Sequence, residues 1–181
     1  MVKWSRIFKI IDGGGLLNDC TTMLREQCVR AELTLDVDVP NHPLTVFGEP
    51  AKLRQIFLNL LSNAVKFTEP GGTVSLSADM TPGRGVAVRI ADTGIGMAKE
   101  DLTIALAPFG QIDSRLARRY EGTGLGLPLT SALVELHRGE LAIDSEPGVG
   151  TVVTVTLARD LGETPNRAAA LQSSNSRRFS A

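Results

Sequence analysis

The sequence predicts an α+β fold, most simply a sheet that carries helices on one face. Short stretches alternate between apolar and polar residues, which is the period of a strand with one buried side. Longer stretches repeat apolar residues at helical spacing, which is typical of an amphipathic helix. About five strands and three main helices are expected, and such elements bury their apolar sides together in layers.

The expected elements follow one another along most of the chain. The predicted strands are Ser5–Ile11, Glu32–Val39, Thr73–Asp79, Val86–Ala91, Leu141–Asp144 and Thr151–Leu157. The predicted helices are Leu16–Cys28, Pro50–Phe67, a short one from Lys99, and Leu125–Leu136. The glycines at 13–15 are expected to break the pattern before the first helix, and residues 40–48 to form a loop. Proline suits the first position of the second helix.

Length and composition describe one ordinary globular domain. The 181 residues are 43% hydrophobic and 22% charged, which suits a single well-buried core. The net charge of −1 gives no reason to expect a nucleic acid or a membrane surface as partner. No apolar run approaches the roughly 18 residues that cross a bilayer, and the first residues do not resemble a signal peptide. The domain is expected to span residues 1–159, and the polar segment 160–181 to be a disordered tail.

Cysteine and histidine offer neither a disulfide framework nor a metal site. Cys20 and Cys28 fall at helical spacing in the first predicted helix, and we interpret them as small apolar residues. His42 and His137 lie far apart in the sequence, which argues against zinc.

The helix predicted for residues 50–67 carries an unusual polar stripe. At about 100° per residue, Asn59, Asn63 and Lys66 share one narrow arc of an otherwise apolar helix. A solvated face is the simplest explanation, but such faces usually carry Glu, Lys and Arg, which favour helices more than Asn does. Amide oxygens can bind Mg²⁺ and a lysine can contact phosphate, so the stripe indicates a binding surface.

A carboxylate and two glycines follow the predicted strand Val86–Ala91. Asp92 continues the register of the residues that this strand buries, so its charge needs a partner. The exocyclic amine of adenine would be one. Gly94 and Gly96 would let the backbone approach a base closely. A turn capped by aspartate is the simpler alternative.

Two further glycine-rich stretches follow. Gly122-Thr-Gly-Leu-Gly-Leu127 leads into a predicted helix, and the free N–H groups at a helix start form a natural phosphate site. Gly148-Val-Gly-Thr151 fits a binding loop and a hairpin turn equally well. No stretch completes a dinucleotide-binding or P-loop motif, so neither of those folds is supported.

Taken together and in this order, these segments resemble the ATP-binding domain of sensor histidine kinases, whose superfamily includes DNA gyrase, the heat-shock chaperone ATPases and the mismatch-repair ATPases. The N box resembles residues 59–68, the F box residues 108–111, and three glycine boxes residues 92–97, 122–127 and 148–151. The resemblance implies a Bergerat-type fold, a two-layer sandwich of a mixed, mainly antiparallel sheet with about three helices on one face.

The resemblance also assigns roles to residues. Asn63 would hold Mg²⁺ with Asn59 in support, and Lys66 would reach the phosphates, which makes these three the candidate catalytic residues. Residues 108–124 would form the ATP lid. The candidate ATP-binding residues are Asp92 for the adenine amine, Phe67 for the ribose or base, Gly94, Gly96, Phe109, Arg115, Arg118, Gly122, Thr123, Gly124, Leu125, Gly126 and Thr151. At least one lid arginine among Arg115, Arg118 and Arg119 is expected to meet the γ-phosphate.

Asn59 helps to choose between branches of the superfamily. In the ATP-hydrolysing relatives, a glutamate at this position serves as the general base for water. A neutral amide cannot accept a proton, so the site is expected to hydrolyse ATP slowly. It would instead pass the γ-phosphoryl group to a protein nucleophile through positioning and Mg²⁺.

The implied partners are a histidine-bearing dimerisation domain and, through it, a response regulator. Neither His42 nor His137 resembles the phosphoacceptor motif, so the dimerisation domain is expected to be absent and the chain to act only on a separate acceptor. We interpret His137 as structural, and Arg138 occupies a position that is commonly glycine. A cytoplasmic monomer without membrane contact is expected.

Three other functions stay open. An anti-sigma-type serine kinase of the same superfamily would phosphorylate serine on a partner. A pseudokinase would bind nucleotide only to regulate a partner. An unrelated α+β binding domain would carry these glycines by coincidence. The asparagine at position 59 and the long basic lid favour the histidine kinase over the serine kinase.

Overall fold

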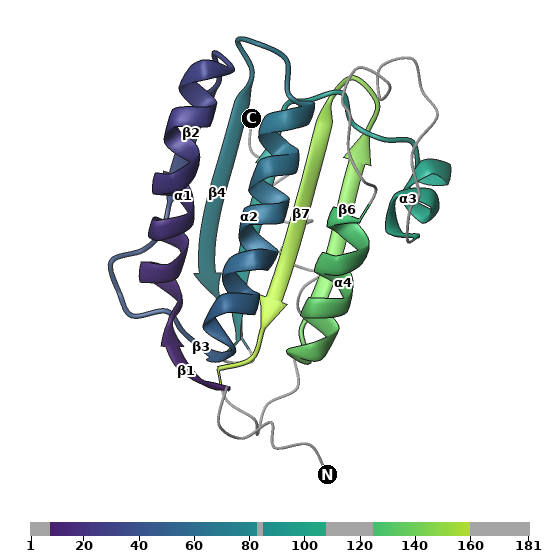
Figure 1. Cartoon of the computed structure of the whole chain (residues 1–181). Helices are drawn as coiled ribbons and strands as arrows, with labels where there is room; N and C mark the ends of the chain where they lie inside the picture. The colour runs from purple at the N-terminus through teal and green to yellow at the C-terminus, as the bar shows by residue number, and fades with distance from the viewer. Residues whose placement is uncertain (1–7, 83–84, 108–124, 160–181) are drawn as a thin grey trace.

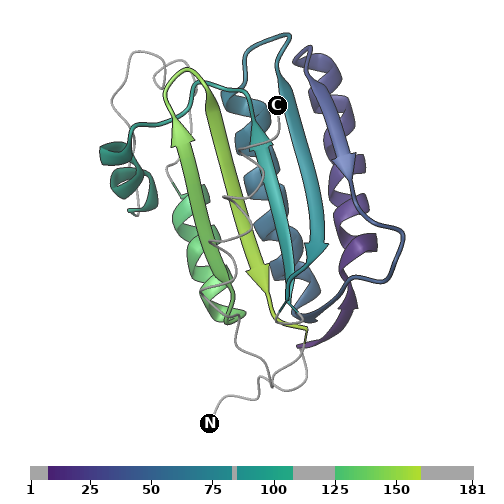
Figure 2. The same ribbon diagram turned by 180° about the vertical axis from the view of Figure 1, so that it is seen from behind.

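The computed structural model describes residues 8–82, 85–107 and 125–159, which form two layers (Figure 1). Its elements are β1 (Lys9–Asp12), α1 (Gly13–Arg30), β2 (Thr34–Asp38), β3 (Thr45–Gly48), α2 (Pro50–Phe67), β4 (Thr73–Met80), β5 (Val86–Asp92), α3 (Lys99–Leu106), α4 (Gly126–Leu136), β6 (Glu140–Glu146) and β7 (Gly150–Leu157). Helices α1, α2 and α4 lie side by side across one face of a sheet. Figure 2 shows the opposite face, over which none of the described helices lies. The predicted two-layer α+β fold is confirmed.

The main sheet has five strands in the order β2-β4-β5-β7-β6. Strand β2 pairs in parallel with β4, and the other pairs are antiparallel. Parallel neighbours need a crossover connection, and here α2 lies in the crossover between β2 and β4. Helix α2 is thereby held against the middle of the sheet.

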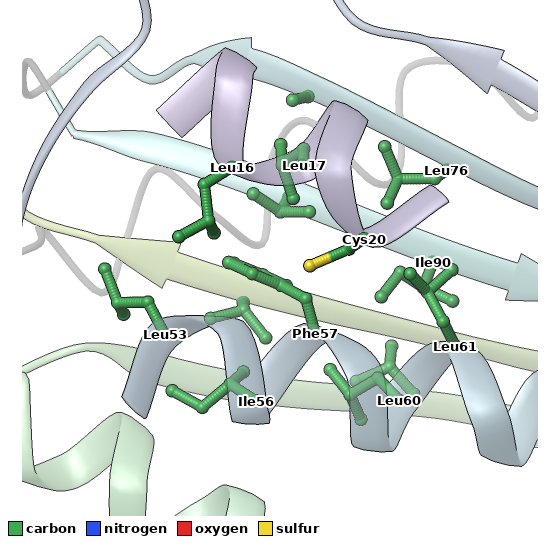
Figure 3. Close-up of a cluster of buried hydrophobic side chains, with 14 of the residues drawn as sticks. Leu16, Leu17, Cys20, Leu53, Ile56, Phe57, Leu60, Leu61, Leu76 and Ile90 are labelled. Atoms are coloured by element: carbon green, nitrogen blue, oxygen red, sulfur yellow. The ribbon is translucent and has the colours of Figure 1, made fainter. Parts of the chain in front are cut away.

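The core lies between the sheet and the three long helices. Helix α2 buries one broad apolar side made of Leu53, Ile56, Phe57, Leu60, Leu61 and Ala64. Phe57 is 2% exposed and points toward Leu16 and Cys20 of α1 (Figure 3). Full burial of such a side chain contributes about 1.5–3 kcal/mol, so this contact is a main attachment of α1 to α2.

Both cysteines belong to this core, as predicted. Cys20 and Cys28 are buried on α1 and are not joined in a disulfide. Burial raises the pKa of the Cys20 thiol to about 11. The thiol is therefore protonated near neutral pH and behaves as a small apolar group.

The glycines at 13–15 do not break the chain, because they form the first turn of α1. This part of the prediction was wrong. The backbone N–H of Gly13 donates to Leu44 O at 2.6 Å, and a Cβ at Gly13 would lie 2.9 Å from that oxygen. A Cβ at Gly15 would lie 2.6 Å from Oδ2 of Asp12. Close packing at the helix start therefore outweighs the poor helix propensity of glycine.

The predicted loop at residues 40–48 was also wrong in its second half. Residues Thr45–Gly48 form β3, which pairs antiparallel with β1 in a separate two-stranded sheet. Val46 is buried opposite Ile11, so a distant partner stabilises a segment too short to show its period. The first predicted strand begins at Lys9 in the structure, and residues 5–7 lie outside the described ranges.

His137 is structural, as predicted, because both ring nitrogens bond to backbone. It is 5% exposed at the end of α4. Its Nδ1 donates to Leu133 O at 2.7 Å, and its Nε2 accepts from the N–H of Glu49 at 3.1 Å. Burial lowers the pKa of His137, so the neutral ring ties the end of α4 to the start of α2.

Two predicted segments, the lid at 108–124 and the tail at 160–181, lie outside the described residues. The domain boundaries therefore stay a prediction. No helix in the described part of the chain is long and apolar enough to cross a membrane.

Candidate nucleotide site

The polar stripe of α2 faces the start of α4. Asn59, Asn63 and Lys66 are each partly buried on α2. The Nδ2 of Asn59 donates to Oγ1 of Thr130 on α4 at 3.5 Å. A Cβ at Gly126, the first residue of α4, would lie 3.5 Å from Nδ2 of Asn63. Asn63 thus lies beside the first residue of α4 and Asn59 beside a residue one turn further along, so neither amide is simply a solvated surface residue.

Thr130 is a site residue that the sequence reasoning missed. It is fully buried, and its Oγ1 donates to Gly126 O at 2.8 Å. Because that hydrogen is used, Oγ1 meets Asn59 as an acceptor and holds the Nδ2 side of its amide. Within the described residues, no hydrogen bond reaches Oδ1 of Asn59. A threonine within a helix as apolar as 125–136 was the available signal.

The N-terminus of α4 suits an anion. Leu125 is the N-cap residue and makes no side-chain capping bond. The first backbone N–H groups of a helix have no partner within the helix, and the helix dipole is positive there. Of the predicted phosphate-binding glycines, Gly126 lies at this end, beside Asn63.

Asp92 ends β5 and is held from two directions. Its Oδ1 accepts from the N–H of Gly94 at 2.9 Å and from the N–H of Thr151 at 3.3 Å. Burial raises the pKa of the Asp92 carboxyl, although these two bonds oppose the rise. Within the described residues, no hydrogen bond reaches Oδ2. The carboxylate therefore offers one oriented oxygen to a donor from outside.

Glycines let the Asp92 turn pack against its neighbours. A Cβ at Gly94 would clash with Phe67 O at the end of α2, and the next N–H, that of Ile95, donates to that oxygen at 3.1 Å. Gly96 has a φ of +63°, and a Cβ there would clash with Glu146 O of β6. Both predicted glycines are thus required by close backbone contact.

Lys66 and Phe67 complete this end of the site from α2. The Nζ of Lys66 lies 5.1 Å from the centre of the Phe67 ring, within the range of a cation–π contact. The backbone at the end of α2 is joined to the Asp92 turn, because the N–H of Ile95 donates to Phe67 O. The end of α2 therefore contributes an aromatic ring and a cation next to the residues of the Asp92 turn.

The β6–β7 hairpin packs against the Asp92 turn. Gly150 has a φ of +132°, and a Cβ there would clash with Asp92 O. Thr151, whose N–H bonds Asp92, also shares a hydroxyl contact of 2.8 Å with Ser145. Ser145 was not among the predicted residues, and a serine on an alternating strand gave no distinct signal.

The structure therefore brings the described candidates into two groups along α2. One group is at Asn59 and Asn63 beside Leu125 and Gly126, and the other is at Lys66, Phe67, Asp92, Gly94, Gly96 and Thr151. At 1.5 Å per residue, Asn59 and Phe67 lie about 12 Å apart along the helix. The remaining candidates, Phe109, Arg115, Arg118, Arg119, Gly122, Thr123 and Gly124, lie outside the described residues.

The site also fits a magnesium ion that arrives with a phosphate ligand. In the described ranges, no three His, Cys, Asp or Glu side chains gather as a metal site. Mg²⁺ keeps several waters and is bound through few protein oxygens together with the phosphates of its substrate. Asn63, beside the first residue of α4, and Asn59, beside Thr130, carry amide oxygens of the kind that such a site uses.

Comparison with known proteins identifies the family. Residues 48–161 match the family model described as histidine kinase-, DNA gyrase B-, and HSP90-like ATPase. The chain belongs to this family. It is 42% identical over 142 residues to the non-motile and phage-resistance protein of Caulobacter vibrioides, and 38% identical over 156 residues to the cell-division control histidine kinase PdhS of Brucella canis. These matches cover 77% and 82% of this chain but only 17% and 15% of the relatives.

Solved structures of histidine kinases share the fold. Full-length ShkA in complex with AMPPNP has a TM-score of 0.74 and 30% identity, over 94% of this chain and 34% of that one. The mycobacterial sensor histidine kinase MprB has a TM-score of 0.70 and 26% identity, over 83% of this chain and 97% of that one. The chain is thus an ATP-binding domain of the histidine kinase type, as the resemblance implied.

Proposed function

We propose that this domain binds ATP with Mg²⁺ and passes the γ-phosphoryl group to a histidine on a separate dimerisation domain, in two-component signalling with a response regulator downstream. The observation that carries the proposal is the pairing of two groups along α2. A partly buried carboxylate with one oriented oxygen lies at one end, and two amides beside the N-terminal part of α4 lie at the other. ShkA, which shares the fold, was solved with the ATP analogue AMPPNP.

In this proposal, Asp92 recognises the base through a hydrogen bond. Its Oδ2 accepts from the exocyclic amine of adenine, while Oδ1 stays bonded to Gly94 and Thr151. Phe67 packs beside the ribose or base, and Lys66 reaches the phosphates as a point charge. Since the partly buried carboxylate needs a donor, adenine is favoured over guanine, which presents a carbonyl at the same edge.

Asn63 and Asn59 hold the phosphate end. Asn63 Oδ1 would bind Mg²⁺ with Asn59 in support, and the start of α4, with Leu125 and Gly126, would receive the phosphates. Mg²⁺ would neutralise charge that develops on the transferred group. In the predicted lid, Phe109, Arg115, Arg118 or Arg119, Gly122, Thr123 and Gly124 would complete the site.

Asn59 directs the phosphoryl group toward a protein acceptor. Its amide donates to Thr130 and cannot take a proton from water, so hydrolysis should be slow. In the described residues, His137 has both ring nitrogens bonded to backbone and cannot act as the acceptor. The acceptor would therefore be supplied by another domain.

Phosphotransfer to a supplied acceptor tests the proposal. The purified chain would be mixed with γ-labelled ATP, Mg²⁺ and a separately purified histidine-bearing dimerisation domain. We expect label on that domain as an acid-labile, base-stable phosphohistidine, and its loss in Asn63→Ala. Asn18→Ala, on the exposed side of α1, is the matched control and should transfer like the wild type.

Other results would contradict the proposal in distinct ways. Label found as an acid-stable phosphoserine would favour the serine kinase. ATP binding without label on dimerisation domains from several kinases would favour a regulatory nucleotide-binding module. Fast release of free phosphate by the wild-type chain alone would contradict the assignment of Asn59.

A further inference from the structure

Ser145 lies where the Asp92 turn meets the β6–β7 hairpin. Its Oγ accepts from the N–H of Met97 at 2.8 Å. The same atom lies 2.8 Å from Oγ1 of Thr151 and 3.2 Å from Gly150 O, to which it donates. One hydroxyl thus joins the end of the turn to both residues at the start of β7.

The hydroxyl of Ser145 is fully used by these contacts. A serine hydroxyl offers one hydrogen and two lone pairs. Met97 takes one lone pair, Gly150 O takes the hydrogen, and the second lone pair then accepts from the hydroxyl of Thr151. The direction of the Thr151 hydroxyl is therefore set by Ser145.

Besides Ser145 and Thr151, the contacts between the turn and the hairpin come from backbone groups and from Asp92. The N–H of Gly148 donates to Ile95 O at 2.8 Å, and the N–H of Thr151 donates to Oδ1 of Asp92 at 3.3 Å. The backbone contacts around Gly96 and Gly150 leave no room for a Cβ. A shift of the hairpin relative to the turn would therefore move the N–H of Thr151 relative to Oδ1 of Asp92.

We propose that Ser145 is a positioning residue for base recognition, which fixes the Asp92 carboxylate and the Thr151 hydroxyl against the edge of the base. This inference rests on the proposed function, in which Asp92 binds the adenine amine. Ser145 itself makes no contact with the phosphate end at Asn59 and Asn63 within the described residues. Removal of the Ser145 hydroxyl should therefore weaken recognition of the base and leave binding of the phosphates unchanged.

The test compares two nucleotides in calorimetric titrations with Mg²⁺. ADP carries the amine that Asp92 would bind, whereas IDP carries a carbonyl in its place. The ratio of the two dissociation constants reports base recognition, and partial unfolding would change the stoichiometry but not this ratio. The variants are Ser145→Ala, Ser145→Thr, which keeps the hydroxyl, and the control Ser77→Ala on β4, opposite Arg89.

For Ser145→Ala we expect ADP to bind about three- to tenfold more weakly, the range expected for one lost hydrogen bond, while IDP changes less. The preference for ADP should therefore shrink. Ser145→Thr should recover most of it, and Ser77→Ala should match the wild type. If Ser145→Ala does not fold, Ser145→Cys, with its weaker donor and acceptor, must show the same selective loss.

Two results would overturn the inference. An unchanged ADP preference in Ser145→Ala, with both affinities intact or both reduced equally, would show that Ser145 does not act on the base. A wild-type chain that binds neither nucleotide would remove the proposed function as well. The two failures are distinguishable because the first leaves wild-type ADP binding intact.

Discussion

The sequence predicts part of the environment of Asp92, but not all of its hydrogen-bond donors. Its register with the buried residues of β5 predicted a partly buried carboxylate, and the structure gives Asp92 a raised pKa caused by burial. The donor Gly94 is local and belongs to the predicted glycine pattern. The donor Thr151 comes from a strand 59 residues away, and no local pattern can predict such a bond.

The raised pKa of Asp92 predicts a pH-dependent cost to stability. The folded state holds the Asp92 proton to higher pH than the unfolded state, so stability from this group is greatest at low pH and falls as pH rises through the folded pKa. Asp92→Asn keeps an Oδ1 acceptor without the charge. We expect this variant to melt at or above the wild-type temperature at pH 7.

The difference between the two melting temperatures should then shrink as pH falls toward about 4, where an unperturbed aspartate is half protonated. Thermal melts from pH 4 to 8 measure it. An Asp92→Asn variant that is less stable than the wild type at pH 7, by an amount independent of pH, would contradict the account.

Thr130 predicts a separate effect on the metal. Thr130→Val keeps a similar shape but removes the acceptor that orients Asn59, whose amide is proposed to support Mg²⁺. With ATP bound, we expect a several-fold weaker apparent affinity for Mg²⁺, measured by titration of the metal. Nucleotide affinity in the presence of a chelator should not change, and Thr130→Ser should restore the wild-type value. Equal losses with and without Mg²⁺ would assign Thr130 a packing role instead.

At the scale of elements, two helices end in the same unusual way. Arg138, after α4, and Glu32, after α1, have φ values of +54° and +56°. Two backbone bonds close each helix. The outer bond runs from Gly139 N–H to Val134 O after α4 and from Leu33 N–H to Cys28 O after α1, and an inner bond lies one residue inside each of them. This is the Schellman motif, in which the residue at this position is usually glycine. The resemblance to the family had already indicated that position 138 is commonly glycine.

Glycine at these two positions should stabilise the domain. A left-handed conformation costs a non-glycine residue roughly 1–2 kcal/mol, and the extra entropy of glycine in the unfolded chain offsets about half of that. We expect Arg138→Gly and Glu32→Gly each to raise the free energy of unfolding by about 0.5–1 kcal/mol, and their effects to add because the sites are separate. Denaturant unfolding measures this.

The matched control is Ala31→Gly at the end of α1, where φ is −88° and glycine relieves no strain. That variant should lose stability. If Arg138→Gly and Glu32→Gly lost as much as Ala31→Gly, the left-handed positions would not be strained.

Helices and long strands could be predicted because their periods are long enough to read. The helix at residues 50–67 and the strand pair 73–79 and 86–91 match α2, β4 and β5 closely. The start of α1 and all of β3 could not, because both depend on packing against distant backbone. Glycines favour a break locally, and only the contact between Gly13 and Leu44 explains a helix there.

At the scale of the whole molecule, the layers followed from the pattern but the strand order did not. The parallel pairing of β2 with β4, and the insertion of β7 between β5 and β6, are contacts between segments far apart in sequence. This order places the Asp92 turn beside the β6–β7 hairpin and both beside the end of α2. The end of the site that is proposed to bind the base therefore depends on the topology, whereas the polar stripe of α2 was visible in one helix.

The chain is much shorter than the curated relatives that it matches. This chain spans 17% and 15% of the two curated relatives, so acceptor and partners belong to the proposal rather than to this domain. For the domain itself, the proposal is that it binds a nucleotide through the carboxylate of Asp92 and the amides of α2.

The most direct test is a calorimetric titration of AMPPNP with Mg²⁺ into the wild-type chain and into Asp92→Asn. The account predicts that the wild type binds at one site and that Asp92→Asn binds about 10- to 100-fold more weakly, because a hydrogen bond to a charged group is lost. Thermal melts confirm that the variant is folded. No binding by the wild type, or equal binding by both proteins, would contradict the account.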